Sequence, residues 1–182
     1  MSAILDAARQ MRLAAPAMAR LDAAMSPHAA VRALLDAGLA ADALSLLARL
    51  LPHRYAVAWV CQCGRGQTLA APDQAGLALA EAWVRDPAEA HRADAAAFAA
   101  EHRYRGIGAW AAAAAGWTGG NLNPRAERPT PPPAHLCAIA AMAALNYLAA
   151  LVPARFDARR LTYVRDALGL LGTPNGPDGG PR

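Results

Sequence analysis

Cysteine and histidine are the residue types in this chain that could bind a metal ion, and there are three and five of them. Cys61 and Cys63 lie two residues apart, and His135 and Cys137 repeat that spacing downstream. Thiolate and imidazole groups are the usual ligands of structural zinc. If Cys61 and Cys63 lie in one helix, however, their side chains point about 200° apart and cannot share an ion. We therefore interpret the cysteines as buried core residues and expect no metal site.

A histidine pair is the next arrangement that could do chemistry. His91 and His102 are eleven residues apart, which places them on one face of a helix. Three helical turns also separate them by about 16 Å, too far for joint ligation or proton transfer. We interpret both as residues of a solvated helix surface.

Nucleophilic catalysis has little support in this sequence. Serine occurs only as Ser2, Ser26 and Ser45, and lysine does not occur. The chain contains no G-x-S-x-G turn, phosphate-binding loop, dinucleotide fingerprint or H-E-x-x-H motif. We therefore predict a protein that is not an enzyme and that uses no cofactor, with an unrecognised helical active site as the remaining alternative.

The composition predicts one small helical domain. Of 182 residues, 51 are alanine and 5% are aromatic, and 55% are hydrophobic. Few aromatic and β-branched residues argue against a β-sandwich or barrel, and three cysteines are too few for a disulfide scaffold. The hydrophobic fraction is too high for a disordered protein. We expect an all-α fold, an irregular bundle or short stack of about seven or eight helices.

The first twenty residues do not resemble an export signal, because charged side chains interrupt every apolar window. The paired Arg159 and Arg160 lie too far along the chain to act as a twin-arginine signal. We therefore expect a cytoplasmic protein. The uncharged segment 134–152 has the length of a membrane span, but it is largely alanine and contains His135 and Asn146. We predict that it is a central buried helix and not a membrane span.

Proline and glycine residues mark the ends of the expected helices. Ser26-Pro27 is a typical helix start and Gly38 a typical stop, so the next helix should form a hairpin with this one. Asp86-Pro87-Ala88-Glu89 reads as a capping box at the start of another helix. The expected helices cover about residues 27–37, 39–51, 53–63, 72–84, 87–102, 106–117, 134–152 and 154–171.

A proline- and glycine-rich loop covers residues 118–133 and precedes the central apolar helix. The run Pro131-Pro132-Pro133 predicts a stiff, polyproline-like segment. The last residues, GTPNGPDGGPR, have the composition of a disordered tail. We therefore expect a single helical domain at 1–171, including the loop, and a disordered C-terminal tail at 172–182.

The net charge of +4 raises the question of nucleic acid, and four arginines lie in the expected last helix. Asp157 and Asp166 interleave with them, and no alternation of aromatic and basic residues is present. We interpret this surface as solvated and expect no nucleic-acid partner.

Tryptophan marks the best candidate for a binding surface. Trp110 and Trp117 are seven residues apart, hence on one helical face, and Trp117 directly precedes Gly119-Gly120. Core packing is one interpretation of all four tryptophans; the other is a partner-binding groove edged by the loop. The candidate partner-binding residues are Trp110, Trp117, Leu122, Pro131, Pro132 and Pro133.

Several segments resemble a bacterial family of unknown function associated with type VI secretion gene clusters. They are LLPHRYAVAWVCQC at 50–63, AEAWVRDPAEAHRADA at 80–95, GAWAAAAAGWTGGNLNP at 108–124 and PPPAHLCAIAAMAALNYLA at 131–149. Some members of that family carry a twin-arginine-signal label, which the N-terminal residues here contradict. The resemblance implies an accessory role beside spike-tip (PAAR-like) proteins and carries over no catalytic residue.

These observations lead to one expected function and one alternative. We expect a non-catalytic, protein-binding adaptor or chaperone in type VI secretion, whose partner is a spike-tip or effector protein. The alternative is a structural or regulatory helical module, unrelated to secretion, that self-assembles through its alanine-rich faces into a homo-oligomer.

Overall fold

The computed structural model describes residues 2–123 and 128–172, and within these ranges the chain is all-α, with no strand. The predicted fold class is confirmed. The helices are α1 (Ala3–Gln10), α2 (Ala15–Met18), α3 (Pro27–Asp36), α4 (Ala40–Leu50), α5 (His53–Gly64), α6 (Ala71–Arg85), α7 (Glu89–Glu101), α8 (Gly106–Gly116), α9 (His135–Ala150) and α10 (Phe156–Ala167), with short 3₁₀ turns η1 (Pro153–Arg155) and η2 (Leu168–Leu171) on either side of α10.

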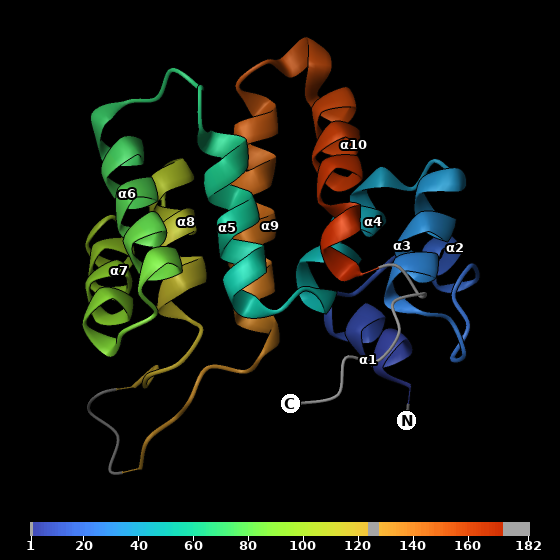
Figure 1. The fold of residues 1–182 in the computed structure, drawn as a ribbon, viewed down its shortest axis with the longest axis horizontal. Helices are drawn as coiled ribbons and strands as arrows, with labels where there is room; N and C mark the ends of the chain where they lie inside the picture. Colours follow the sequence, from blue (N-terminus) through green and yellow to red (C-terminus); the bar gives the residue numbers. More distant parts are fainter. Residues whose placement is uncertain (1, 124–127, 173–182) are drawn as a thin grey trace, which may run out of the picture.

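The helices form a bundle with two ends that differ in character (Figure 1). At one end α6, α7 and α8 pack on one another, and α8 also packs along α9. α5 and α9 cross the middle, and α4 and α10 join them to the N-terminal helices at the other end. α6 also packs on α5, so α5 and α8 together attach α6 and α7 to the rest of the molecule.

The hairpin of α3 and α4 forms as the sequence predicts. The Ser26 hydroxyl accepts a hydrogen bond from the Ala29 amide at 3.2 Å, which caps α3. Gly38 has a φ of 74°, the left-handed conformation that ends a helix. Val31 and Leu34 are buried against α4.

The predicted capping box at the start of α7 is wrong. Asp86 ends α6, with its amide donating to the Ala82 carbonyl, and α7 begins at Glu89 without a side-chain cap. The Glu89 carboxylate does not reach back but forms two hydrogen bonds with the Arg92 guanidinium, at 2.6 and 2.7 Å. The N-cap of α7 is Ala88, so Glu89 is the first helical residue and does not occupy the third helical position that a capping box requires.

Differences from the predicted helices occur at the two ends of the chain. α1 and α2 lie in a region for which the sequence analysis assigns no helix. The expected helix 154–171 is divided into η1, α10 and η2, with Val164 buried and Leu161, Leu168 and Leu171 half-buried. The predicted disordered tail is residues 172–182, and all of it except Gly172 lies outside the described part of the chain.

Two glycines allow α6 and α8 to touch through their backbones. A Cβ atom added at Gly76 would lie 2.3 Å from the Gly108 carbonyl carbon and oxygen. A Cβ atom at Gly108 would lie 2.6 Å from the Asp73 Cα. Only glycine permits this approach, since non-bonded carbon atoms normally stay about 3.5–4.0 Å apart.

The same crossing supplies the missing cap of α8. The Asp73 carboxylate, in the first turn of α6, accepts a hydrogen bond from the Gly108 amide at 2.8 Å. This amide belongs to the first turn of α8, where backbone donors have no partner inside the helix and a negative charge is favourable. α8 is thus fixed at its N-terminus by a residue 35 positions earlier in the chain.

The apolar segment before Val152 forms α9, whose inward positions are buried against α4, α5, α8 and α10. Across residues 2–123 and 128–172, no single helix is long and apolar enough to cross a membrane. α9 and the stretch Pro153–Leu171 satisfy the length and composition test only as a pair, and they are bent by 115°.

Candidate protein-binding groove

Three aromatic rings meet on the outer side of α8. The ring centroid of Tyr104 lies 5.9 Å from that of Trp110 and 5.3 Å from that of Trp117, and the two tryptophans are 6.1 Å apart, edge to face. These distances are those of favourable aromatic pairs in direct contact. All three side chains stay half-buried, so this aromatic cluster is packed on itself and still reaches the surface.

Tyr104 joins the cluster through an unusual backbone. Arg103 and Tyr104 both have left-handed conformations, with φ of 52° and 55°. The Tyr104 amide donates to the Ala99 carbonyl at 2.9 Å, which closes the end of α7. Left-handed non-glycine residues cost about 1 kcal/mol or more each, and such strain is concentrated at functional sites.

The aromatic cluster borders a groove of about 290 Å³ between α7 and the loop after α8. Tyr104 and Trp117 contribute rings to it, and Leu122 and Pro132 contribute aliphatic surface from the loop. The remaining lining consists of three alanines of α7, the Arg92 side chain and polar or glycine positions: Ala96, Ala97, Ala100, Gly116, Gly119 and Asn121. A groove lined by apolar and aromatic surface with a few polar groups is the usual form of a binding site.

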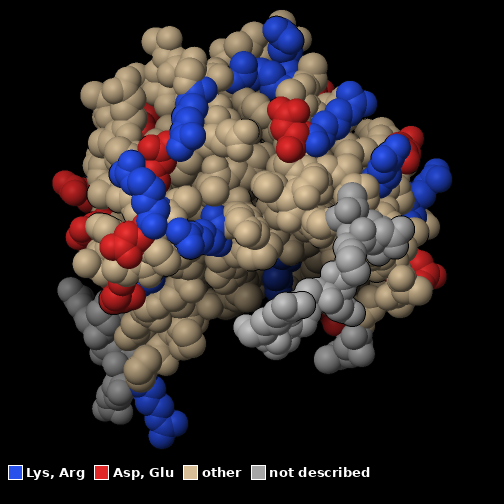
Figure 2. Space-filling model, in the orientation of Figure 1, with Lys and Arg blue, Asp and Glu red and all other residues tan. Residues whose placement is uncertain are grey.

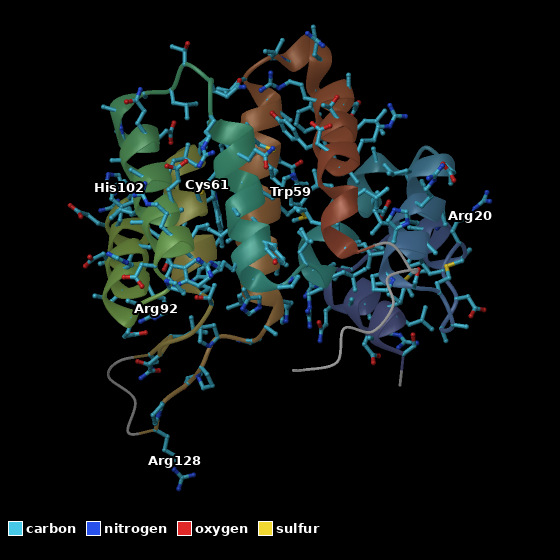
Figure 3. All side chains as sticks on the ribbon, in the orientation of Figure 1. Arg20, Trp59, Cys61, Arg92, His102 and Arg128 are labelled. Atoms are coloured by element: carbon cyan, nitrogen blue, oxygen red, sulfur yellow. The ribbon has the colours of Figure 1, made fainter. Side chains whose placement is uncertain are left out.

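Arg92 holds the beginning of the loop against α7. Its side chain is only 14% exposed and donates to the Gly116 carbonyl at 2.8 Å in addition to the two bonds with Glu89. Gly120 has a φ of 81°, and a Cβ atom there would lie 2.5 Å from the Arg92 Cζ. Figure 3 shows Arg92 near the N-terminal end of α7, close to the point where the loop leaves α8. The loop therefore needs glycine at this point, because the left-handed φ strains any other residue and the guanidinium lies directly beneath.

The Arg92–Glu89 pair also changes the acid strength of both groups. The hydrogen bonds from Arg92 lower the pKa of Glu89 below its usual value. The same bonds raise the pKa of Arg92. The pair stays ionised at neutral pH, so the loop is held by a charged anchor.

The two arms of the loop are tied to each other beyond this anchor. The Leu122 amide donates to the Thr130 carbonyl at 2.8 Å, and the Asn121 side-chain oxygen accepts from the Thr130 amide at the same distance. These bonds set the position of Leu122, whose side chain is 42% exposed. Residues 124–127, which complete the predicted loop, lie outside the described residues.

Of the predicted partner-binding residues, the structure brings Trp117, Leu122 and Pro132 together in one groove. Trp110 lies behind them, in contact with Trp117 and Tyr104, and does not line the groove. Pro131 and Pro133 are exposed on the same arm but outside the lining.

Sequence reasoning missed Arg92 and Tyr104 as groove residues. The spacing of Glu89 and Arg92 is the helical i, i+3 spacing of an ion pair, which was readable. Their contact with a loop more than 20 residues away was not. No glycine marks the left-handed turn that carries Tyr104, so the sequence held no signal for it.

The other two tryptophans are core residues. Trp59 and Trp83 are buried, and the Trp59 indole donates to the Tyr163 carbonyl at 3.1 Å. Core packing therefore describes Trp59 and Trp83, and the partner-binding interpretation of the half-buried Trp110 and Trp117 stays a prediction.

The cysteines and histidines do not form a reactive centre in the part of the chain that the structure describes. Burial raises the pKa of Cys61, Cys63 and Cys137 to about 12, so these free thiols stay protonated. No group of three or more His, Cys, Asp or Glu side chains that could hold a metal occurs among these residues. His91 and His102 each donate from Nδ1 to a carbonyl of their own helix region, Asp86 and Phe98.

Charges are mixed on the molecular surface. Figure 2 shows arginines and carboxylates close to one another over much of the visible face. Among the described residues, ion pairs within one helix join Arg32 to Asp36 and Arg160 to Asp157. The groove therefore differs from the rest of the surface in its aromatic and aliphatic lining and not in an excess of positive or negative charge.

Comparison with known proteins gives a family for this chain. No curated protein and no solved structure matches it. Residues 30–171 match the model of a family of unknown function, DUF6931. This match includes every helix from α4 to α10 and all residues of the groove. The chain therefore belongs to the DUF6931 family of unknown function.

Proposed function

We propose that this protein is a non-catalytic accessory protein that binds another protein in the groove beside α7 and α8. The observation that carries the proposal is the combination of exposed Leu122 with the half-buried rings of Tyr104 and Trp117 around one groove. Tyrosine and tryptophan dominate the energetics of protein interfaces when they enter a desolvated contact.

Hydrogen bonds also hold the described parts of the loop in place without a partner. The Arg92 anchor and the paired arms at Leu122 and Thr130 restrict the loop. A surface that is ordered in advance loses less entropy on binding, so more of the contact energy appears as affinity. This favours the groove over other exposed apolar residues as the docking surface.

As a more specific proposal, the partner is a spike-tip or effector protein of type VI secretion, and this protein acts in the cytoplasm as its adaptor or chaperone. The support is the resemblance of four segments to proteins associated with those gene clusters. Three of the four segments contribute residues to the groove, at 80–95, 108–124 and 131–149.

The test is capture of the partner from the native host with the tagged chain. We expect a partner at near-stoichiometric yield with the unchanged protein, and a strong loss with Trp117→Ala combined with Leu122→Ala. Leu122→Ala alone has a matched control in Leu151→Ala, because Leu151 is 43% exposed and Leu122 42%, on different parts of the surface. Circular dichroism establishes that each variant keeps its helices.

Capture that survives the double change, or that falls equally with Leu151→Ala, means that the groove is not the docking surface. Capture of nothing from cells that express the system favours the alternative, a self-assembling module. That alternative has less structural support, since Ala111–Ala115 of α8 are fully buried inside the monomer and not free to associate. It predicts a concentration-dependent mass in sedimentation, which the adaptor does not.

A further inference from the structure

A second cavity, separate from the groove, lies between the end of α1 and the first half of α9. Its volume is about 400 Å³, larger than that of the groove. Cavities that hold small molecules in proteins have volumes of about 300–1,000 Å³. The lining consists of Gln10, Met11, Arg12, His135, Ile139 and Met142.

The lining combines an apolar surface with cationic and hydrogen-bonding groups. Met11, Ile139 and Met142 supply flexible apolar contacts, and methionine adapts to ligands of different shape. Arg12 supplies a guanidinium. A second one is close by, because Arg49 Nε donates to the Gln10 side-chain oxygen at 2.7 Å.

Two carboxylates of the segments beside this cavity are engaged with other partners. Asp6 pairs with Arg9 at 2.9 Å, and the Asp42 carboxylate accepts a hydrogen bond from the Ala14 amide at 2.9 Å. None of the six lining residues is acidic. The cavity therefore presents positive charge beside apolar surface, which is complementary to an anion with a hydrocarbon body.

Arg12 occupies a backbone position that usually belongs to glycine. It follows the last residues of α1 with a φ of 55°, and the Leu13 amide donates back to the Ala8 carbonyl at 3.1 Å. This is the hydrogen bond of a glycine-terminated helix, in which the residue in the left-handed conformation is glycine in most proteins. The chain instead places an exposed arginine there, whose side chain lines the cavity. Among the residues that the structure describes, Arg12 belongs to no ion pair.

We propose that this cavity binds a small organic anion with an apolar body, such as a medium-chain carboxylate. The hydrocarbon lies against Met11, Ile139 and Met142, and the anionic group accepts hydrogen bonds from Arg12 and His135. The site does not depend on the protein-binding groove, and either one can fail without the other.

The test uses three probes with the same chain and different heads: octanoate, octanol and octylammonium. Calorimetric titration of the full chain should show one octanoate bound per molecule, with octanol binding at least about tenfold more weakly for want of a charge-assisted hydrogen bond. Octylammonium should not bind. Amide resonances of α1 and of the first half of α9 should shift with octanoate.

Two substitutions of Arg12 and one control substitution test whether octanoate binds at this cavity. Arg12→Gln should weaken octanoate binding about tenfold, since it removes one charged donor. Arg20→Gln removes the same charge from an exposed residue outside the cavity, labelled at the edge of the molecule in Figure 3, and should leave affinity unchanged. Arg12→Gly should also weaken binding while the thermal midpoint stays the same or rises, because glycine adopts the left-handed conformation without strain.

Retention of the fold in Arg12→Gly separates lost binding from unfolding. The proposal is overturned if octanoate binds no more tightly than octanol, if Arg12→Gln and Arg20→Gln have the same effect, or if octanoate does not bind at all.

Discussion

Replacing Gly76 by alanine tests how closely α6 and α8 approach each other. The new methyl carbon would lie 2.3 Å from the Gly108 carbonyl group, more than 1 Å inside the ordinary contact distance of about 3.5 Å. The obstacle is backbone and cannot rotate away, so the helices must separate. Separation by that amount breaks the hydrogen bond from the Gly108 amide to the Asp73 carboxylate, now 2.8 Å long.

The expected cost combines these terms. Overpacking costs about 1–3 kcal/mol, and loss of the hydrogen bond that caps α8 costs about 1–2 kcal/mol. The higher helix propensity of alanine offsets about 1 kcal/mol of this cost. We therefore expect the free energy of unfolding to fall by about 1–4 kcal/mol, which in a chain of this size lowers the thermal midpoint by about 2–16 °C.

Circular dichroism at increasing urea and temperature measures the effect. Gly169→Ala is the matched control, because a Cβ atom at Gly169 meets no atom within 4 Å. It should leave stability unchanged or raise it by up to about 1 kcal/mol. A Gly76→Ala protein as stable as the unchanged chain would refute the close crossing of α6 and α8.

Three further predictions concern the cap of α8, the buried thiols and the Arg92 anchor. Asp73→Ala should lower the free energy of unfolding by about 1–2 kcal/mol through loss of the α8 cap, and Asp73→Asn by less, as measured by urea unfolding. Burial raises the pKa of the three cysteine thiols from 9.0 to about 12, so they should react with a disulfide reagent at pH 8 only after urea is added. The free energy of unfolding should fall as the pH rises above 9, because the thiols ionise there in the unfolded chain and not in the folded one. The pKa of Glu89 is lowered from 4.5 by Arg92, so the anchor is complete above pH 4.5 and is lost as the pH falls through the lowered value. Tryptophan fluorescence should report this loss, and Glu89→Gln should abolish that part of the change; an identical acid transition in both proteins would contradict the anchor.

The sequence predicts the fold class well because alanine-rich helices and their proline and glycine boundaries are local features. Ser26, Gly38 and Pro52 act within a few residues of their own positions, and the hairpin of α3 and α4 follows from them. The capping box predicted at Asp86 is wrong because α7 begins later than the sequence pattern suggests. With Ala88 as the N-cap, Glu89 is the first helical residue, and its carboxylate pairs with Arg92.

The candidate groove was predicted only in part because its supports come from distant residues. Trp117 and Leu122 were identified from residue type and from their place beside a glycine-rich loop. The contact of Arg92 with Gly116 and the left-handed Tyr104 depend on how α7 lies on α8. Nothing in a single sequence specifies that arrangement, since small residues on both helices allow several.

The alanine-rich core and the half-buried aromatic cluster have a common cause. The buried residues of α8 are glycine and alanine apart from Ile107, and they pack on α6, α7 and α9, so the inner face of α8 has no space for a large ring. Trp110 and Trp117 must therefore lie on the outer side, where Tyr104 packs against them. Close packing at the Gly76 crossing thus determines where the aromatic surface can form. A change that separates α6 from α8 should disturb the groove as well as the core, and loss of partner binding in Gly76→Ala would follow from the same contact that lowers its stability.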